Sequence, residues 1–289
     1  MKKSYLLFLP VLLAGFLSTA QASAQALTMG DRPSFGPLNL SKPGVIDKAT
    51  LVVTYKLTWS EVGGSKKFVD LRTVLVGKLV QYSRNDGLFL NDKVATSQIK
   101  KGAKGVKLYS DPVIPYELYV YGNAKDFDFG YRAFFDPYSV WYGETMPKID
   151  WKIGKETETI LKQSCTKATA NYRGKTLTAW FAESIPTNVG PYLFRGLPGA
   201  ILKAEIGGLE WEAIGIRKGT EKDEIIKYGR PKDDMSRAKA LKFIKEMYED
   251  PVGFFEAMGV ECYDSANPDK RLRPGSKSYP LPLLISLEL

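Results

Sequence analysis

The chain has 289 residues, 44% of them hydrophobic and 12% aromatic, a composition typical of a packed globular protein that excludes a disordered one. Its net charge of +9 is spread along the sequence without any nucleic-acid-binding motif, so we expect no nucleic-acid partner. It contains no His, which removes the usual general base of Ser and Cys hydrolases and the commonest zinc ligand.

The first residues have the pattern of a secretory signal peptide. A basic start precedes an apolar run over residues 5–17, and Ala-x-Ala sites end at Ala24 and Ala26. The apolar run is shorter than the roughly 20 residues that span a bilayer, so we expect cleavage rather than anchoring. We predict a signal peptide at residues 1–26 and one domain at 27–289, with no transmembrane segment in the mature chain. This domain is expected in the periplasm or at the periplasmic face of the outer membrane.

Alternating β-branched and aromatic residues predict strands in the first half of the chain. The stretches Ala49–Trp59 and Phe68–Tyr82 show this alternation on either side of a Gly pair. It recurs in Tyr116–Tyr121 and Phe127–Phe135, and a further strand is predicted to begin after Trp151. The spacing favours strands that pair with their neighbours along the chain.

Two hairpins are predicted in the second half. In Ala200–Ile216 a Gly-Gly pair separates two alternating runs, which is a strong two-residue turn signal and places Ala204 opposite Trp211. A second hairpin is predicted to turn at Arg173–Gly174. Both predictions depend only on local turn chemistry.

One clear helix pattern follows, at Ser236–Glu249, and Pro251 ends it. A shorter helical turn is expected at Phe254–Met258. Many strands with few helices near the end of the chain predict an α+β fold. We expect a mostly antiparallel, curved sheet with a C-terminal helix packed on it.

Five aromatic residues form the candidate binding surface. They lie on two predicted neighbouring strands: Tyr119, Tyr121, Phe127, Phe129 and Tyr131. The two tyrosines share one strand face and the other three share another, so one row could line a groove for an acyl chain, a sugar or a peptide. Ordinary core packing is the alternative, since a β-rich core also needs aromatic residues.

Acidic residues offer a weaker signal. Asp126 and Asp128 project from one strand face and could hold Ca²⁺ or act as an acid-base pair, but no Gly-punctuated calcium loop surrounds them. Solvated carboxylates are the simpler interpretation. Catalytic carboxylates of a hydrolase could come from any part of the chain, so a carboxylate-dependent hydrolase stays an alternative function. We expect no metal and no cofactor.

The two Cys residues, Cys165 and Cys262, are too few for a Cys-only zinc site. In an oxidising compartment they could form a disulfide, which would tie the C-terminal part of the chain to a core hairpin. Two buried, unpaired thiols are the alternative. Spacing alone does not decide between them.

A Gly- and Pro-containing motif lies between the two predicted hairpins, at Gly196, Leu197, Pro198 and Gly199. Pro198 presets the second torsion of a turn and Gly199 is expected to supply a positive φ at the third position, which predicts a type II turn. We expect this motif to have a structural role, launching the strand that begins at Ala200.

The motif and its surroundings resemble the GLPGLI family of exported Bacteroidota proteins. The resemblance rests on the Cys165–Ala168 stretch, Tyr172–Lys175, Ala179–Trp180 and Gly196–Leu202, where Ala200 replaces the family Leu. It is specific over roughly Trp151–Glu205. The family has no established activity, so the resemblance implies export and a β-rich fold more than a function.

Together these patterns favour a non-enzymatic binding or accessory protein of the cell envelope. Its expected partner is an apolar or extended ligand, or a periplasmic or outer-membrane protein. A carboxylate-dependent hydrolase and an envelope assembly or scaffold protein are the alternative functions.

Overall fold

The computed structural model describes residues 26–33, 35, 43–102, 113–122, 124–134, 139–228 and 235–289. The expected signal peptide lies outside these residues except for Ala26, and the domain boundaries at 26 and 27 stay predictions. The chain forms two compact units: Met1–Pro33 with Phe243–Pro280, called unit 1, and Ser34–Lys242 with Leu281–Leu289, called unit 2. Within the described ranges, no helix is long and apolar enough to cross a membrane.

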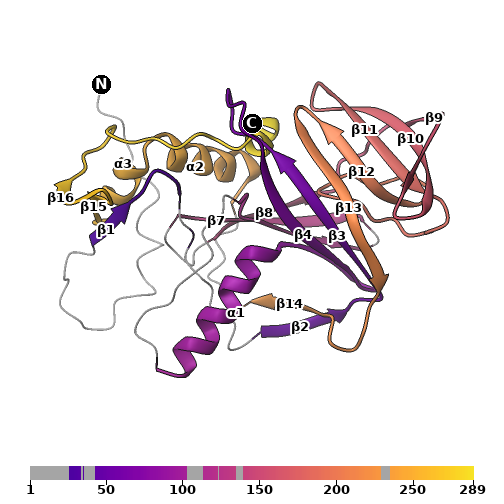
Figure 1. Ribbon diagram of the computed structural model, residues 1–289, viewed down its shortest axis with the longest axis horizontal. Helices are drawn as coiled ribbons and strands as arrows, with labels where there is room; N and C mark the ends of the chain where they lie inside the picture. Colours follow the sequence, from indigo (N-terminus) through magenta and orange to yellow (C-terminus); the bar gives the residue numbers. More distant parts are fainter. Residues whose placement is uncertain are drawn as a thin grey trace. The chain divides into compact units, whose positions relative to one another are not determined.

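Unit 2 is built on one antiparallel sheet of eleven strands (Figure 1). Across the sheet they are β8 (Ser139–Thr145), β7 (Asp126–Arg132), β6 (Tyr116–Tyr121), β5 (Val80–Asn85), β4 (Phe68–Val76), β3 (Leu51–Trp59), β13 (Leu209–Lys218), β12 (Ala200–Ile206), β11 (Lys175–Ala182), β10 (Gln163–Tyr172) and β9 (Lys152–Ile160). Two meanders, β3 to β8 and β9 to β13, join where β13 pairs with β3. The expected α+β, mostly antiparallel class is confirmed, and the sheet does not close.

Both predicted hairpins are confirmed with their register. Ala204 pairs with Trp211 across the Gly207–Gly208 turn, and the strands at Arg173–Gly174 close as expected. All four turn residues have positive φ, between 50° and 88°, as a two-residue type I′ turn requires. Local turn chemistry was therefore sufficient to set the pairing in this half of the sheet.

The expected strand Phe68–Tyr82 is wrong because the chain turns at Gly77, between β4 and β5. A Cβ at Gly77 would lie 2.2 Å from the carboxylate of Asp47. That carboxylate accepts the backbone N–H groups of Leu79 and Val80, at 2.6 and 3.1 Å. A residue distant in sequence thus creates the turn, which alternation along the strand could not reveal.

The helix α1 (Asp86–Lys100) was not predicted. It contacts β4 and β5, and its buried side includes Asn91, Asp92 and Thr96 as well as Leu88. Polar residues therefore interrupt the apolar stripe by which an amphipathic helix is recognised. Asn85 caps its start by accepting the Leu88 N–H at 2.7 Å.

Three further helices follow near the end of the chain. They are α2 (Arg237–Glu249), α3 (Pro251–Glu256) and α4 (Leu283–Glu288). The first matches the expected helix within one residue, and its residues divide between the two units. The short helix α4 packs on the sheet of unit 2: the Leu283 N–H donates to the Ser60 carbonyl at 3.2 Å. A C-terminal helix thus packs on the sheet, but it is α4 and not the expected helix at Ser236–Glu249.

Unit 1 contains a small sheet of β1 (Ala26–Met29), β15 (Glu261–Asp264) and β16 (Asn267–Arg271). β1 pairs with β15 in parallel, with Leu27 opposite Cys262. Asp250 caps α3 by accepting the Gly253 N–H at 3.0 Å, and it also accepts the Gly275 N–H at 2.9 Å. These bonds tie the helices of unit 1 to its C-terminal segment.

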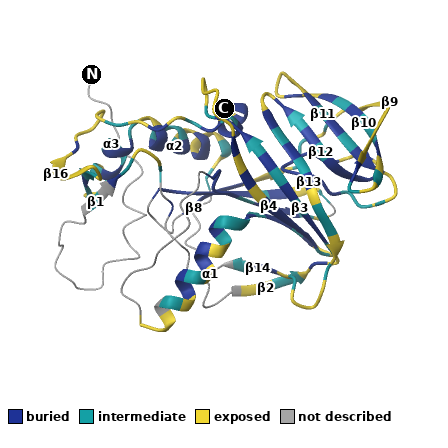
Figure 2. Ribbon diagram, viewed as in Figure 1, coloured by how far each residue is buried: buried dark blue, intermediate teal, exposed yellow. Residues whose placement is uncertain are grey.

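A two-stranded ribbon of β2 (Pro43–Lys48) and β14 (Glu224–Tyr228) completes unit 2. Ile225 and Ile46 of the ribbon belong to an apolar cluster with Leu75, Tyr82 and Trp141 of the large sheet. Figure 2 shows how the burial is distributed along the large sheet, with exposed residues concentrated at its turns and at β9. The ribbon thus covers part of one face of the sheet, while Val69 and Leu71 of β4 and Ile214 of β13 stay exposed.

Candidate functional site

The five candidate aromatic residues keep the two rows expected from the sequence, and the rows lie on opposite faces of the sheet. Tyr119 pairs with Asp128, and Phe129 pairs with Leu118, so side chains of the two rows point in opposite directions. Four of the five are at most 2% exposed, and Tyr121 is intermediate. Neither row lines an open groove, and the core-packing interpretation describes their positions.

The ribbon covers the row of Tyr119 and Tyr121. Tyr119 stacks on Tyr82 with ring centroids 4.4 Å apart and donates its hydroxyl to the Ile226 carbonyl at 2.8 Å. Lys227 lies over both tyrosine rings and places its Nζ 2.7 Å from the Tyr121 hydroxyl and 3.0 Å from Asp128. Asp128 is therefore paired, not solvated, and this polar contact anchors the ribbon.

The loop between β11 and β12, residues 183–199, covers the other face. Tyr192, Leu193 and Phe194 of this loop are at most 1% exposed. The Tyr192 ring meets Tyr116 edge-on at 5.6 Å, and the Phe194 ring meets Trp211 edge-on at 5.4 Å. Side chains of this loop thus fill the space over the aromatic row, where the sequence analysis considered a groove for an apolar ligand.

The motif Gly196–Gly199 ends this loop, and its expected turn is wrong in one respect. Gly199 does not have a positive φ; Gly196 does, at 96°. Gly199 is needed for a different reason, because a Cβ there would lie 2.2 Å from the carbonyl oxygen of Ala182. The structural role expected for the motif agrees with this contact between two backbone segments.

Arg195, next to the motif, is 6% exposed. Its Nη1 donates to the Tyr192 carbonyl at 2.6 Å, and its Nε and Nη2 donate to Gln81 Oε1 at 3.3 and 3.1 Å. Gln81 in turn donates to the Asn188 carbonyl at 2.9 Å, and the Asn188 side chain accepts the Gly196 N–H at 3.0 Å. This network holds the loop on β5.

The same stretch of chain is the part that other proteins share. Residues 171–203 match the model of a family described as "Protein of unknown function (Porph_ging)". The match covers the end of β10, all of β11, the covering loop with its motif, and the start of β12. No curated protein matches the sequence.

Two solved structures resemble the chain, both of a protein named PNGF-II. The structure in space group C2 has a TM-score of 0.44 at 14% identity, and the aligned part covers 66% of this chain and 32% of the PNGF-II chain. The structure in space group P21 has a TM-score of 0.42 at 15% identity, with 64% and 31% shared. The chain thus spans about a third of the length of these PNGF-II chains.

Within the matched segment, Tyr172 and Arg173 contact a buried carboxylate, that of Glu288 in α4. Glu288 is 1% exposed and forms ion pairs with Arg173 at 3.0 Å and Arg237 at 2.9 Å. It also accepts the Tyr172 hydroxyl at 3.2 Å. Burial, and then the charge of Glu288, raise the pKa of Tyr172. This contact holds α4 on the sheet.

Sequence reasoning did not find the small cleft beside α1. Its lining is Tyr82, Arg84, Asn85, Leu88, Phe89, Asp92, Pro115, Tyr116, Glu117 and Arg132, with room for about one water molecule. Arg132 forms a two-point ion pair with Asp92, both distances being 2.9 Å, and lies 3.6 Å from Glu117. These residues come from α1, β6 and β7, so no local spacing could reveal their meeting.

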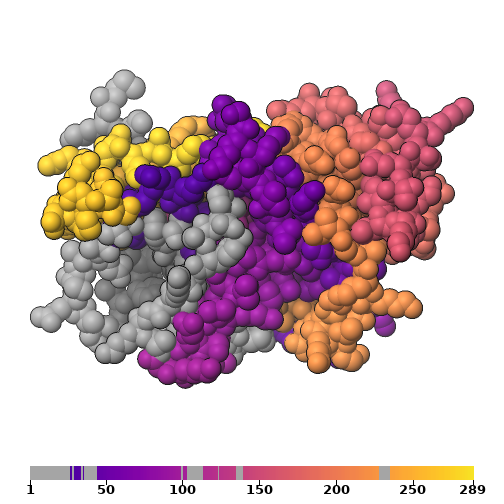
Figure 3. All heavy atoms as spheres, in the orientation of Figure 1, coloured from indigo at the N-terminus to yellow at the C-terminus, as the bar shows by residue number. Residues whose placement is uncertain are grey.

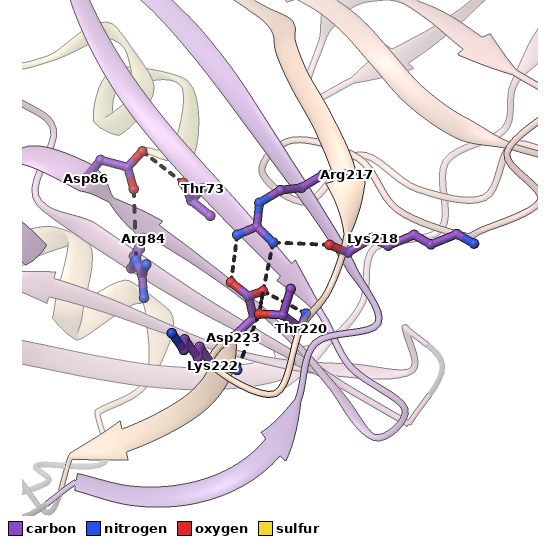
Figure 4. Close-up of polar contacts among 8 residues, drawn as sticks. All are labelled: Thr73, Arg84, Asp86, Arg217, Lys218, Thr220, Lys222 and Asp223. Atoms are coloured by element: carbon purple, nitrogen blue, oxygen red, sulfur yellow. Dashed lines mark hydrogen bonds and ion pairs between the residues drawn. The ribbon is translucent and has the colours of Figure 1, made fainter.

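Close to the cleft, burial raises the pKa of two further carboxyl groups. Asp70, fully buried, has a pKa raised to about 6 and accepts the Ile114 N–H at 3.1 Å. Asp86 accepts the Thr73 hydroxyl at 2.8 Å and faces Arg84 at 3.9 Å (Figure 4), and burial raises its pKa too. Both groups have partners, Asp70 in the core and Asp86 at its border, where its side chain is 32% exposed.

Figure 4 also shows the polar contacts of the turn between β13 and β14. Asp223 accepts both Nη atoms of Arg217, at 2.6 and 2.7 Å, and the Thr220 N–H at 2.8 Å. The Arg217 guanidinium holds the pKa of Asp223 far below its ordinary value. The contacts are internal to the turn, which makes it a structural element.

The structure has both cysteines free and buried, Cys165 in unit 2 and Cys262 in unit 1, and the disulfide considered from the sequence stays a prediction. Each thiol faces a carbonyl of its own segment, Cys165 that of Gln163 at 3.6 Å and Cys262 that of Val260 at 4.0 Å. Burial raises the pKa of both, that of Cys262 to about 11.

We expect two alkylated thiols per chain when the protein is unfolded without reductant, and slow alkylation of the native protein, because burial disfavours the thiolate. Intact mass measures both results. An unreduced mass that shows no alkylation after unfolding would contradict the unbonded state.

Proposed function

We propose that the chain is an exported, GLPGLI-like cell-envelope protein of the periplasm that binds a partner protein and is not an enzyme. The resemblance in the motif region and the signal-like N-terminus support export. Among the binding partners considered from the sequence, an extended segment of another protein suits the sheet best. The observation that carries this choice is the open edge strand β9.

β9 is the border strand of the eleven-stranded sheet, and among the described strands it pairs only with β10. Eight of its nine residues, Lys152 to Thr159, are exposed. In Figure 3 the pink to red atoms of this region form the border of unit 2. The opposite border strand, β8, is partly covered, because its Trp141 carbonyl accepts the Met235 N–H at 3.1 Å.

The register shows which groups of β9 point outward. A two-residue turn at Leu161 and Lys162, both with positive φ, closes the β9–β10 hairpin at the pair Ile160 and Gln163. The closing pair of such a hairpin is hydrogen-bonded, and bonded pairs alternate with non-bonded ones. The N–H and C=O of Thr157 and Thr159 therefore face away from β10 and are available to an added strand.

Charge disfavours a second copy of this chain as the added strand. An antiparallel copy centred on Thr157 would place Glu156 opposite the Glu158 of the other molecule, and like charges directly opposite destabilise pairing. A different polypeptide avoids this repulsion. We therefore propose an extended segment of a partner protein.

The other two alternatives have less support from the site geometry. An apolar ligand would need the space that Tyr192 and Phe194 fill. A hydrolase would need unengaged carboxylates, whereas Asp92 and Glu117 in the α1 cleft both face the same guanidinium, that of Arg132.

Site-specific photo-crosslinking in the native host tests the partner. A benzoylphenylalanine at Thr159 should crosslink one defined protein, and the same group at Lys222, in the turn after β13, should not. Thr157→Pro, which removes an outward N–H, should abolish the crosslink, while Thr157→Val keeps the N–H and should preserve it. Equal crosslinking from both positions, or an unchanged product with Thr157→Pro, would contradict the proposal.

Export is tested separately by the mass of the mature protein. Cleavage at either Ala-x-Ala site should give an N-terminus at Gln25 or Leu27 in the periplasmic fraction, because signal peptidase cuts after the second small residue. A protein in the membrane fraction that still begins near Met1 would contradict it.

A further inference from the structure

The register of β9 determines which side chains an added strand would meet. Glu158 pairs with Cys165 on the β10 side, one residue away from the outward-facing backbone groups of Thr157 and Thr159. An antiparallel strand added at the border therefore forms its hydrogen-bonded pairs at the two threonines. Glu158, and Glu156 beyond Thr157, then stand opposite partner residues in non-hydrogen-bonded pairs, in which the side chains lie closer together.

A register shift limits the length of this edge. The pairing of β9 with β10 is regular from Thr157 to Ile160, and it shifts between Thr157 and Ile153. Such an irregularity bends the strand and interrupts the row of groups to which another strand can bind. The partner therefore contributes a short segment, aligned with the stretch from Glu156 to Ile160.

The charge that is most accessible along this stretch is negative. The side chains of Glu156 and Glu158 are 73% and 42% exposed. Their ion-pair partners lie further into the sheet and are less exposed, Lys167 of β10 at 29% and Lys203 of β12 at 18%. A strand added at the border thus meets the two carboxylates before it meets the lysines.

The pairing inside the sheet leaves Glu158 with unused acceptor capacity. Its carboxylate lies 3.8 Å from Lys203 Nζ, which is too long for a hydrogen bond. Lys203 is also 3.3 Å from Glu205, so two carboxylates share one ammonium group. The exposed lysines of β9 itself, Lys152 and Lys155, lie before the regular stretch. A further cation at the border would therefore be favourable.

We propose, on the basis of the function proposed for β9, that the segment added to it is basic and carries Lys or Arg at the two alternate positions opposite Glu156 and Glu158. Opposite charges that face each other directly stabilise a pair of strands, and like charges destabilise it. An acidic segment would place like charges in both pairs and is excluded. Thr157 and Thr159 project from the other face of β9 and impose no charge on the partner.

The segment that crosslinks to benzoylphenylalanine at Thr159 gives a direct readout. Mass-spectrometric sequencing after chymotrypsin digestion should show two basic residues separated by one residue. A crosslinked segment without this pair would overturn the charge requirement and leave strand addition at β9 intact.

Charge-neutralising variants test the same requirement independently. Glu156→Gln combined with Glu158→Gln should lower the crosslink yield about three- to tenfold, because two favourable cross-strand pairs are lost. Glu210→Gln removes a partly exposed carboxylate from β13, away from the border, and should leave the yield unchanged. An unchanged yield in the double variant would show that the partner does not read these carboxylates. No crosslink from Thr159 in the otherwise unaltered protein would instead contradict the proposed function itself.

Discussion

Glu288→Ala should destabilise unit 2 by about 3–5 kcal/mol, the largest effect we expect from a single substitution. The change removes the carboxylate from between Arg173 and Arg237, whose side chains are 31% and 20% exposed, and leaves the two guanidinium groups without it. It also removes the acceptor of the Tyr172 hydroxyl. Chemical denaturation followed by tryptophan fluorescence measures the loss, since Trp211 is buried in the same unit.

An exposed ion pair of the same unit provides the control. Glu221 pairs with Lys48, and the two side chains are 87% and 54% exposed. Surface pairs of this kind contribute little, so Glu221→Ala should leave the unfolding transition where it is. Glu288→Gln keeps an acceptor for the Tyr172 hydroxyl, so its free energy of unfolding should lie between those of Glu288→Ala and Glu221→Ala. Equal stability of Glu288→Ala and the unaltered protein would mean that α4 does not depend on this carboxylate.

Gly199→Ala should destabilise the protein by about 2–3 kcal/mol, although Ala is the smallest possible addition. The new Cβ would lie 2.2 Å from the Ala182 carbonyl oxygen and 2.6 Å from its carbon. Both are backbone atoms in paired strands, so neither can move without displacing β11 or β12. Gly199→Val should be worse still. The denaturant midpoint measures both losses.

Gly215→Ala is the matched control for crowding. It lies in β13 without a positive φ, and its Cβ would meet nothing nearer than Thr54 at 3.9 Å. We expect its stability to change by less than about 0.5 kcal/mol. Gly196→Ala isolates the cost of a positive φ, because a Cβ there would make only ordinary contact, 3.7 Å from Trp151 Nε1. If Gly199→Ala and Gly215→Ala have the same denaturant midpoint, the close approach to Ala182 is not the reason that position 199 requires glycine.

The fold was predictable where its causes are local. The residue types at Gly207–Gly208 and Arg173–Gly174 determine the backbone conformation of these two turns, and the turns determine the register of their hairpins. The turn at Gly77 could not be predicted, because Asp47 creates it from a distant strand. The helix α1 was missed because Asn91 and Asp92 on its buried side are satisfied by tertiary contacts that no periodicity contains.

The candidate site was predictable only in part. Alternation grouped the five aromatic residues into two rows, but it could not show that the rows lie on opposite faces of the sheet or that a ribbon and a loop cover them. The covering loop has the Pro, Gly and Asn content of a surface segment. It is buried because Gln81 and Asn188 satisfy its polar groups, and Arg195 meets Gln81 of β5 only after both meanders have come together.

The parallel pairing of β1 with β15 has a consequence for how the molecule is made. Leu27 lies opposite Cys262, so this contact closes a loop of roughly 235 residues, one of the most entropically expensive closures available to such a chain. Contacts of that sequence separation form late, because the nearer ones must first shorten the path. Of the described strands, β1 is therefore synthesised some 235 residues before its partner β15. Slow, late protection of the Leu27 amide in pulsed hydrogen exchange would report that order.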